Sequence, residues 1–534
     1  MRRLVASLAL MLPAAIPYLA HLLDHRPESL PTGYIQQDMP IYMAKAREAF
    51  KDGGFHLFYA NPSDGLGDRP RIYFQPWTFA LGLIQRVTGC PPGVLWVAFW
   101  FVSAWAASRV FLAVYEEFVG LETRSKRLGL VAFFWGGGVM AIAGIVRAIV
   151  LGRGPTWDDL TAFDPFRGWW FLNLGRNLVY PTEALYHALA FGGILCATRI
   201  FRGDRQSKVF LMHILVALTA ACSPFAGLEV LAILWTASVV EMIASPRRYI
   251  AYLIWLMMTN LCTISALYYL AYLNCFPEHW AIAERMALPW RYSWGTVPTA
   301  YGIVFALAAW RFRTKARARI MLADPMNRLL IVWAVTAFAL ENHDLVVSPH
   351  QPIHFTRGYV WSALFLLGAP TLISIFDRLG RPSRLLLLGF LLVDNATWFA
   401  TFAHDYGVPD RNGVRLSSEA LEIVRRLDGD DFRGHILISE DERISYLALA
   451  ETRLRTVLGH PLETPHYERR RIEVDALLAR GRFAAAWGGY PLVVVRYRQL
   501  GLPDWVEANG GHLVFANRKF QILQFAADRP SRKL

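Results

Sequence analysis

The stretch that decides the fold of this chain is PGVLWVAFWFVSAWAASRVFLAVYE, residues 92–116. It is apolar and aromatic almost throughout, and its charged residues are Arg109 and Glu116. A helix of about 20 apolar residues crosses the roughly 30 Å of hydrocarbon in a bilayer. Only helices and closed barrels pair all their backbone groups inside lipid, and the stretch lacks the alternation of a barrel strand. It therefore predicts a membrane-spanning helix.

Stretches of similar length and composition recur through most of the chain. Of its 534 residues, 54% are hydrophobic and 18% are charged, whereas about a quarter of the residues of a soluble domain are charged. We predict spans near residues 4–23, 92–116, 129–151, 184–201, 208–222, 224–244, 249–273, 296–312, 327–342, 358–376 and 385–404. The predicted fold class is an α-helical polytopic membrane protein with about eleven transmembrane helices.

The positions of the basic residues predict the orientation of these spans. The formal net charge is +13, which by itself would fit a protein that binds nucleic acid. However, Lys and Arg concentrate in segments that would all lie on one side of such a protein: residues 2–3, 124–127, 202–208, 247–248, 311–319 and 378–384. The positive-inside rule makes that side cytoplasmic. We therefore expect no nucleic-acid partner, a cytoplasmic N-terminus and a multi-pass protein of the plasma (inner) membrane.

The longer segments fall on the opposite side, where loops of this length commonly carry function. They are residues 24–91, 152–183, 274–295, 343–357 and the tail. In the tail, SSEALEIVRRLDG predicts a capped helix, HILIS and LVVVRY predict buried strands, and the segment around Asn517 predicts a hairpin. We predict a transmembrane helical domain at 1–404, with a large first outer loop at 24–91, and a small soluble extracytoplasmic α/β domain at 405–534.

The first outer loop contains GYIQQDMPIYMAKAREAF, residues 33–50. Its apolar residues recur at helical spacing and predict a helix that lies at the membrane interface. Asp38 precedes Met39 and Pro40, which is the position of an N-cap. Alternatively, the same carboxylate faces a cavity, where it could take a proton from a hydroxyl group or hold a divalent metal through oxygen. We expect no cofactor beyond this optional metal.

The second outer loop supplies Arg176, Glu183 and His187 as candidate substrate-binding residues. Glu183 and His187 are four residues apart at the start of a predicted helix, so they share one face. Ionisable groups at the end of a span are costly unless they serve a cavity or pair with each other. This placement therefore fits either a binding site or mutual pairing of the two side chains.

The segment ENHDLVVSPHQPIHFTRGYVW, residues 341–361, places several polar side chains beside a predicted span. His350 and His354 have a spacing that would suit a metal on a helix, but Pro352 between them argues against a regular helix there. Arg357 has the planar donor fork that binds phosphate, or it snorkels toward water. We consider His350, His354 and Arg357 candidate substrate-binding residues.

The order of these features resembles the GT-C superfamily of membrane glycosyltransferases. The resemblance rests on a first span followed by an early outer acid in QQDMPIYMAKA, an amphipathic helix, the aromatic segment RIYFQPW and the second span. It implies a polyprenyl-phosphate-linked sugar donor and assigns Asp38 as base or metal ligand. Gln36 and Gln37 stand where many members carry further acid, so Asp38 is the only carboxylate in its segment.

The leading hypothesis is an inverting glycosyltransferase that acts on an envelope glycan, lipid or protein acceptor at the outer face of the membrane. Asp38 would deprotonate the acceptor hydroxyl, Arg357 and His354 would stabilise the departing phosphate, and Glu183 would orient the acceptor. Two alternatives stay open. One is an envelope lipid or glycan transporter or flippase, for which Arg147, Arg199 and Asp394 would be the polar residues within spans. The other is a non-enzymatic membrane scaffold.

Overall fold

The computed structural model of the chain describes residues 2–24, 26–66, 69–203, 207–244, 248–405 and 414–527. Its contacts divide the chain into two compact units. The first, which we call the helical unit, comprises Met1–Pro17, Phe99–Ala271 and Ala287–Val408. The second, which we call the α/β unit, comprises Tyr18–Ala98, Tyr272–Met286 and Pro409–Leu534. The two units are described separately below.

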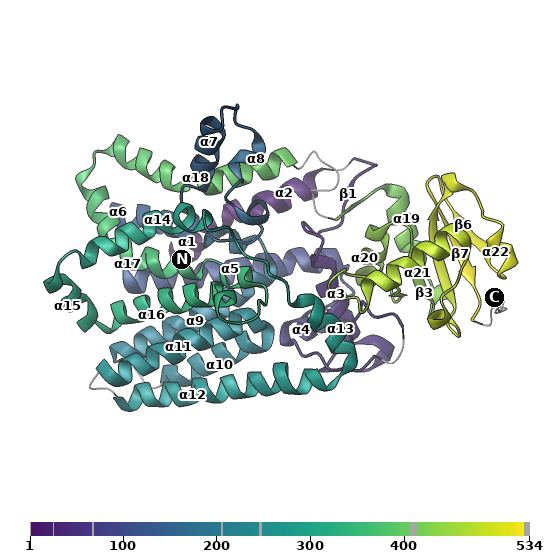
Figure 1. The fold of residues 1–534 in the computed structure, drawn as a ribbon, viewed down its shortest axis with the longest axis horizontal. Helices are drawn as coiled ribbons and strands as arrows, with labels where there is room; N and C mark the ends of the chain where they lie inside the picture. Colours follow the sequence, from purple (N-terminus) through teal and green to yellow (C-terminus); the bar gives the residue numbers. More distant parts are fainter. Residues whose placement is uncertain are drawn as a thin grey trace. The chain divides into compact units, whose positions relative to one another are not determined.

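Long apolar helices that run side by side make up most of the helical unit (Figure 1). The helices of this unit are α1 (Arg2–Met11), α5 (Pro92–Phe118, shared with the α/β unit), α6 (Arg124–Trp135), α7 (Met140–Val150), α8 (Trp157–Leu160), α9 (Pro181–Arg202), α10 (Ser207–Cys222), α11 (Pro224–Ala244), α12 (Arg248–Ala266), α14 (Thr296–Ala309), α15 (Lys315–Ala323), α16 (Pro325–Glu341), α17 (Tyr359–Arg378) and α18 (Arg381–Asp405). Within the described ranges, 7 helices are long and apolar enough to cross a membrane, or up to 9 if each bent pair is one span. The count of about eleven spans stays a prediction.

The stretch predicted as one span at 129–151 forms the bent pair α6 and α7, whose axes differ by 65°, and its crossing of the membrane as one span stays a prediction. Three consecutive glycines, Gly136–Gly138, form the break. A Cβ atom on Gly138 would lie 1.9 Å from the carbonyl oxygen of Thr299, and one on Gly137 would lie 2.7 Å from the Cβ of Asp394. Glycine is required here because neighbouring chain approaches the backbone too closely for a side chain.

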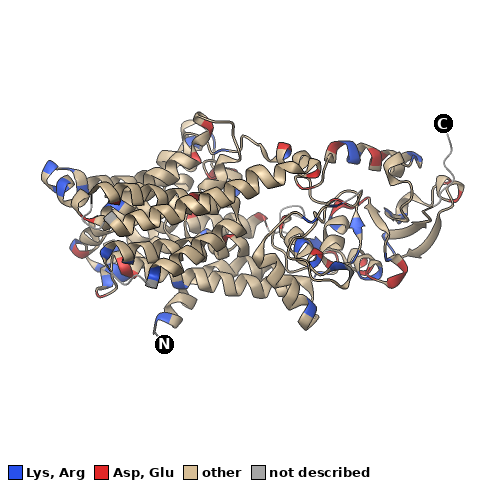
Figure 2. Ribbon diagram, turned by 90° about the horizontal axis from the view of Figure 1, so that it is seen from below, with Lys and Arg blue, Asp and Glu red and all other residues tan. Residues whose placement is uncertain are grey.

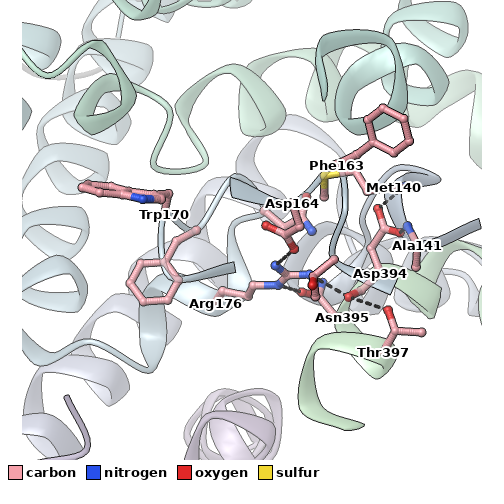
Figure 3. A network of polar contacts seen from close by, with 12 residues as sticks. Met140, Ala141, Phe163, Asp164, Trp170, Arg176, Asp394, Asn395 and Thr397 are labelled. Atoms are coloured by element: carbon pink, nitrogen blue, oxygen red, sulfur yellow. Dashed lines mark hydrogen bonds and ion pairs between the residues drawn. The ribbon is translucent and has the colours of Figure 1, made fainter. Parts of the chain in front are cut away.

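Asp394 of α18 caps the second half of this broken pair (Figure 3). Its Oδ2 accepts a hydrogen bond from the Met140 backbone N–H at 3.1 Å, and its Oδ1 accepts one from the Ala141 N–H at 3.0 Å. The first N–H groups of a helix have no partner within the helix. A carboxylate at that position therefore satisfies them and also interacts favourably with the helix dipole.

Several of the predicted basic segments meet at one end of the helical unit, where Lys and Arg gather in Figure 2. Arg3 pairs with Glu116 at 2.7 Å, and Arg199 pairs with Glu117 at 2.8 Å. Ser125 donates a hydrogen bond to Asp377 at 2.5 Å. Residues 204–206 and 245–247 of the predicted basic loops lie outside the described residues. The side of the membrane that this end faces stays a prediction.

The α/β unit combines short helices with a five-stranded sheet. Its helices are α2 (Ala15–Leu23, shared with the helical unit), α3 (Met39–Glu48), α4 (Pro76–Thr88), α13 (Pro277–Met286), α19 (Ser418–Leu427), α20 (Glu442–Glu451), α21 (Tyr467–Arg480) and α22 (Trp505–Ala508). Its strands are β1 (Leu30–Pro31), β2 (Arg415–Leu416), β3 (Ile436–Ser439), β4 (Arg455–Thr456), β5 (Leu492–Tyr497), β6 (His512–Ala516) and β7 (Phe520–Phe525). The sheet order is β4-β3-β5-β7-β6, and β6 and β7 are antiparallel, which confirms the predicted strands and hairpin.

The first outer loop and the C-terminal tail belong to the same unit. Strand β1 pairs with β2, and α3 packs against α20 through Ile41, Ala44 and Leu449. The Asp64 carboxylate accepts a hydrogen bond from the buried Arg470 at 2.6 Å. The predicted boundary at residue 404 divides the chain at one point of its sequence. The contacts instead place residues 18–98 in the same compact unit as the tail.

We expect Asp394→Ala to destabilise the helical unit, because it removes both hydrogen bonds at the start of α7. Loss of a helix cap lowers the free energy of unfolding by about 1–2 kcal/mol. The matched control is Asp158→Ala, which removes an exposed carboxylate paired with Arg167, and such pairs contribute roughly 0–1 kcal/mol. The measurement is the thermal unfolding midpoint of each detergent-solubilised variant. Equal midpoints for the two variants would contradict the capping role.

Candidate functional site

Asp38 lies at the start of α3, but its side chain makes no capping hydrogen bond to that helix. Its Oδ1 instead lies 2.9 Å from Nε2 of His460, and its Oδ2 accepts a hydrogen bond from the Gln36 amide at 3.2 Å. The Asp38 side chain is 48% exposed, while that of His460 is 9% exposed. The carboxylate is thus held on one side and open to solvent on another.

The surroundings of His460 determine which of its ring nitrogens carries the proton. Its Nδ1 accepts a hydrogen bond from the Leu462 backbone N–H at 3.1 Å. This contact assigns the neutral tautomer in which Nε2 carries the hydrogen and donates it to Asp38. The His460 backbone N–H is itself bonded to the Ser63 hydroxyl at 3.3 Å. The imidazole is therefore fixed at both nitrogens and through its backbone.

Further contacts fix this part of the tail to α3. Lys45 pairs with Glu463 at 2.6 Å, and the Asn61 amide donates to the Glu463 backbone carbonyl at 2.7 Å. The ring of Tyr446, on α20, packs edge-on against His460 with centroids 5.8 Å apart. Burial and, second, the nearby Asp38 carboxylate raise the pKa of the Tyr446 phenol well above its usual value. Tyr446 is therefore a neutral hydrogen-bonding group at this site.

Sequence reasoning missed His460 and Tyr446. His460 occurs in LGHPL, residues 458–462, which carries no motif. A lone histidine in an apolar segment more often belongs to a core than to a site. Its partner Asp38 lies 422 residues away in the chain. Only the packing of the tail against α3 brings the two together.

Arg357 is the centre of a second cluster, which lies in the helical unit. Its side chain is 10% exposed, and its Nη1 lies 3.7 Å from Glu183 Oε1. Its Nη2 lies 3.4 Å from Nδ1 of His354, and its guanidinium lies over the rings of Trp170 and Phe171, at 5.1 and 5.4 Å. The Nε atom is buried with no hydrogen-bond partner in the described ranges. Arg357 is thus a buried cation with weak pairing, not a snorkelling surface residue.

Other buried polar atoms near Arg357 also lack partners among the residues that the structure describes. They are Trp170 Nε1, Thr182 Oγ1, Tyr359 OH and both carboxylate oxygens of Glu229. Glu229 lies one turn after Phe225 on α11, and the Phe225 ring stacks on His354 at 4.4 Å. A buried polar atom without a partner costs free energy. Such a group of atoms is suited to a ligand with several hydroxyl or phosphate oxygens.

His187, His350 and Arg176 have other surroundings. The fully buried His187 ring lies between two backbone carbonyls, those of Glu183 at 2.7 Å and Arg357 at 2.6 Å, so it positions α9 against the start of α17. His350 is exposed, and its Nδ1 lies 3.1 Å from the Ser348 carbonyl. His354 itself lies in a 3₁₀ turn at Pro352–Phe355, so the two histidines do not share a regular helix, as the position of Pro352 indicated. Across the described ranges, no group of three or more His, Cys, Asp or Glu side chains could hold a metal ion.

Arg176 is fully buried, and its guanidinium contacts other groups of the protein (Figure 3). Its Nε donates to Asn395 Oδ1 and its Nη2 to the Asp394 carbonyl, both at 2.6 Å, and its Nη1 pairs with Asp164. It therefore joins the second outer loop to α18, and we assign it a structural role. The predicted site residues fall in both units: Asp38 belongs to the α/β unit, and the others belong to the helical unit.

No family model and no curated protein matches this chain. Solved structures similar to it include an oligosaccharyltransferase, ArnT and an arabinofuranosyltransferase. One is the oligosaccharyltransferase of Archaeoglobus fulgidus tethered with an acceptor peptide, at 11% identity over 92% of this chain and 69% of that chain, with a TM-score of 0.47.

Two further structures are similar over nearly all of this chain. ArnT from Cupriavidus metallidurans is 12% identical over 98% of both chains, with a TM-score of 0.49. The arabinofuranosyltransferase AftD from Mycobacteria is 16% identical over 97% of this chain and 41% of that chain, with a TM-score of 0.49. Because all three TM-scores are below 0.5, the function proposed below depends on the side chains of this chain.

Proposed function

We propose that this protein is an integral-membrane glycosyltransferase that moves a sugar from a polyprenyl-phosphate donor to an envelope acceptor. The observation that carries the proposal is the half-exposed Asp38 carboxylate, which His460 orients by donating Nε2–H at 2.9 Å. A general base must be ionised, positioned and accessible to the proton that it removes. Asp38 meets these requirements in a chain whose described residues include 7 to 9 candidate membrane spans.

In this proposal Asp38 accepts the proton of an acceptor hydroxyl group. The hydroxyl oxygen forms a bond to the anomeric carbon of the donor sugar, on the face opposite the phosphate. The bond between that carbon and the phosphate oxygen breaks, and polyprenyl phosphate leaves with the electron pair. The configuration at the anomeric carbon is thereby inverted. His460 is a positioning residue, because it touches Asp38 and not the reacting atoms.

We assign Arg357 to the phosphate of the donor. Guanidinium groups bind phosphate through paired hydrogen bonds, and a buried site strengthens such contacts because little water competes. The 3.7 Å separation from Glu183 is too long for a hydrogen bond, so Glu183 balances the charge of Arg357 without occupying its donor fork. The walls formed by Trp170 and Phe171 exclude water from the guanidinium.

The residues that favoured a transporter have partners typical of structural roles. Asp394 caps α7, Arg199 pairs with Glu117 at 2.8 Å, and Arg147 lies over the ring of Phe163 at 5.9 Å. A proton or substrate pathway would require groups that change partners. These contacts therefore favour sugar transfer over transport.

Asp38→Asn should abolish sugar transfer, because an amide cannot accept the hydroxyl proton. We expect a loss of about 10²- to 10⁴-fold in kcat. The assay measures transfer of labelled sugar from polyprenyl-phosphate donors in nanodiscs that contain the purified protein. Asp504→Asn, an exposed carboxylate of the same unit, is the matched control, and a chelator arm tests the divalent metal. Full activity of Asp38→Asn would refute the assignment and favour a scaffold.

His460→Ala should lower kcat by roughly 10- to 100-fold with little change in the KM of the acceptor, because the base loses its orientation but stays ionised. His460→Gln keeps a side-chain N–H that can donate to Asp38, so it should recover a large part of the loss. This rescue distinguishes positioning from a general structural role. If Gln and Ala were equally impaired and both proteins had lowered unfolding midpoints, His460 would be structural only.

Arg357→Lys should lower kcat/KM for the donor by about 10- to 100-fold, because an ammonium group cannot form the paired hydrogen bonds of a guanidinium. Arg291→Lys is the control, since Arg291 is a partly exposed residue of the same unit paired with Asp344 at 2.8 Å. The measurement varies the donor concentration at fixed acceptor. An unchanged kcat/KM would remove Arg357 from the donor site.

A further inference from the structure

The α/β unit contains a cavity of about 880 Å³, and neither Asp38 nor His460 lines it. It is bounded by the C-terminal turn of α3, by α4, by the end of α20 and by the edge strand β4. Pockets of 300–1,000 Å³ are typical of small-molecule sites. The volume is therefore sufficient for a ligand much larger than a single ion.

Cationic side chains outnumber acidic ones on the walls of this cavity. The cationic residues are Arg47, Lys51, Arg86, Arg433, Arg453 and Arg455. The acidic residues are Glu48, Asp428 and Glu451. Glu48 is already engaged, since it accepts a hydrogen bond from Lys51 at 2.6 Å and pairs with Arg69 at 3.4 Å. The cavity thus has an excess of positive charge.

Part of this charge is deep in the unit. Arg47 donates one hydrogen bond to the Ala450 carbonyl at 2.6 Å, and burial lowers the pKa of its guanidinium. Arg433 and Arg453 are exposed and lie at the rim. The Asp428 and Glu451 carboxylates partly balance the charge of Arg47, but the cationic side chains on the walls still outnumber the acidic ones and repel one another. An anionic ligand would offset this repulsion and would find exposed donors at the rim.

The walls of the cavity also indicate where the ligand comes from. Gly82, Gln85 and Arg86 on α4 line it, whereas Ile84 and Val87 on the same helix are 46% and 76% exposed. A helix with one polar and one exposed apolar face lies at a membrane interface. Pro92, the first residue of a candidate membrane span, also lines the cavity. The cavity therefore lies at the depth of lipid headgroups.

We infer that this cavity binds the phosphate-bearing headgroup of an anionic membrane lipid. Arg forks bind phosphate oxygens through charge-assisted hydrogen bonds, and the apolar face of α4 would contact the acyl chains. The site uses none of the residues assigned to sugar transfer. The inference is therefore independent of the proposed function, and its test measures binding and not activity.

Glu451 makes this binding dependent on pH. Burial raises the pKa of its carboxyl group to about 7. The groups that face it are Arg47 on α3, Tyr34, whose hydroxyl donates to it at 3.4 Å, and Asp428 at the end of α19. Below pH 7 Glu451 becomes neutral and the cavity loses a negative charge. An anion should therefore bind more tightly at pH 6 than at pH 8.

The test uses the full chain in nanodiscs made of phosphatidylcholine with or without phosphatidylglycerol, and native mass spectrometry counts the retained lipids. We expect Arg433→Gln combined with Arg453→Gln to weaken retention of phosphatidylglycerol by about tenfold or more. The control combines Arg425→Gln with Arg480→Gln, two exposed arginines of the same unit that do not line the cavity. Both rim residues are exposed, so neither variant should impair folding.

Equal retention by the rim variant and the control would overturn the inference, because binding would then reflect net charge only. A second arm titrates inorganic pyrophosphate into phosphatidylcholine nanodiscs. One outcome would contradict lipid binding: the wild type binds pyrophosphate, the rim variant does not, and neither retains phosphatidylglycerol. The cavity would then be a site for a free phosphate compound.

A third arm compares pH 6 and pH 8. Retention by the wild type should fall several-fold at pH 8, whereas Glu451→Gln, which is neutral throughout, should retain the lipid equally at both values. A pH dependence that persists in this variant would remove Glu451 from the site. The rim variants test the cavity even if Glu451→Gln does not fold.

Discussion

A buried charge must find a partner within the protein, because neither lipid nor a packed core solvates it. Arg176 shows how far this requirement shapes the helical unit. Its guanidinium joins Asp164, Asn395 and the Asp394 carbonyl, while the Asp394 carboxylate caps α7 next to the glycine break. One set of contacts therefore fixes the second outer loop, a bent helix pair and α18. Arg357 departs from this pattern, since its pairing is long and its Nε has no partner in the described ranges.

The same requirement connects the early and late parts of the α/β unit. Lys45 with Glu463, Asp64 with Arg470, and Asp38 with His460 each join the first outer loop to the C-terminal tail. The half-exposed Asp38 differs from Glu463 and Asp64, which each pair with a cation. Its partner is a neutral imidazole, so no ion pair offsets its negative charge. A carboxylate that is oriented and not neutralised is suited to proton transfer. This difference separates the proposed base from its structural neighbours.

Residue pattern alone predicted those elements whose formation depends on local sequence. Helix α5 follows from an unbroken apolar stretch, and β3 and β5 follow from short β-branched runs bounded by turns. The local pattern did not predict features that depend on a distant contact. The span at 129–151 is bent by 65° because Gly136–Gly138 admit the backbone near Thr299 and the Asp394 side chain. Of the two roles considered for Asp38, side-chain capping does not occur, because the carboxylate contacts His460 instead.

The sequence by itself determined that this is a helical membrane protein, and it predicted the long apolar helices, the strands β3 and β5 and the hairpin β6–β7, but not α20 or β4. It also marked Asp38 and Arg357 as candidate site residues. Hydrophobic length and periodicity are local properties, so they can be read along the chain. Tertiary structure alone decided which partner each polar side chain has. Arg176 contacts other protein groups, and the His187 ring lies between two backbone carbonyls. Asp38 is oriented by a histidine 422 residues away. The physical reason is that the role of a polar side chain is set by its partners in space, and the chain brings those partners together only when it folds.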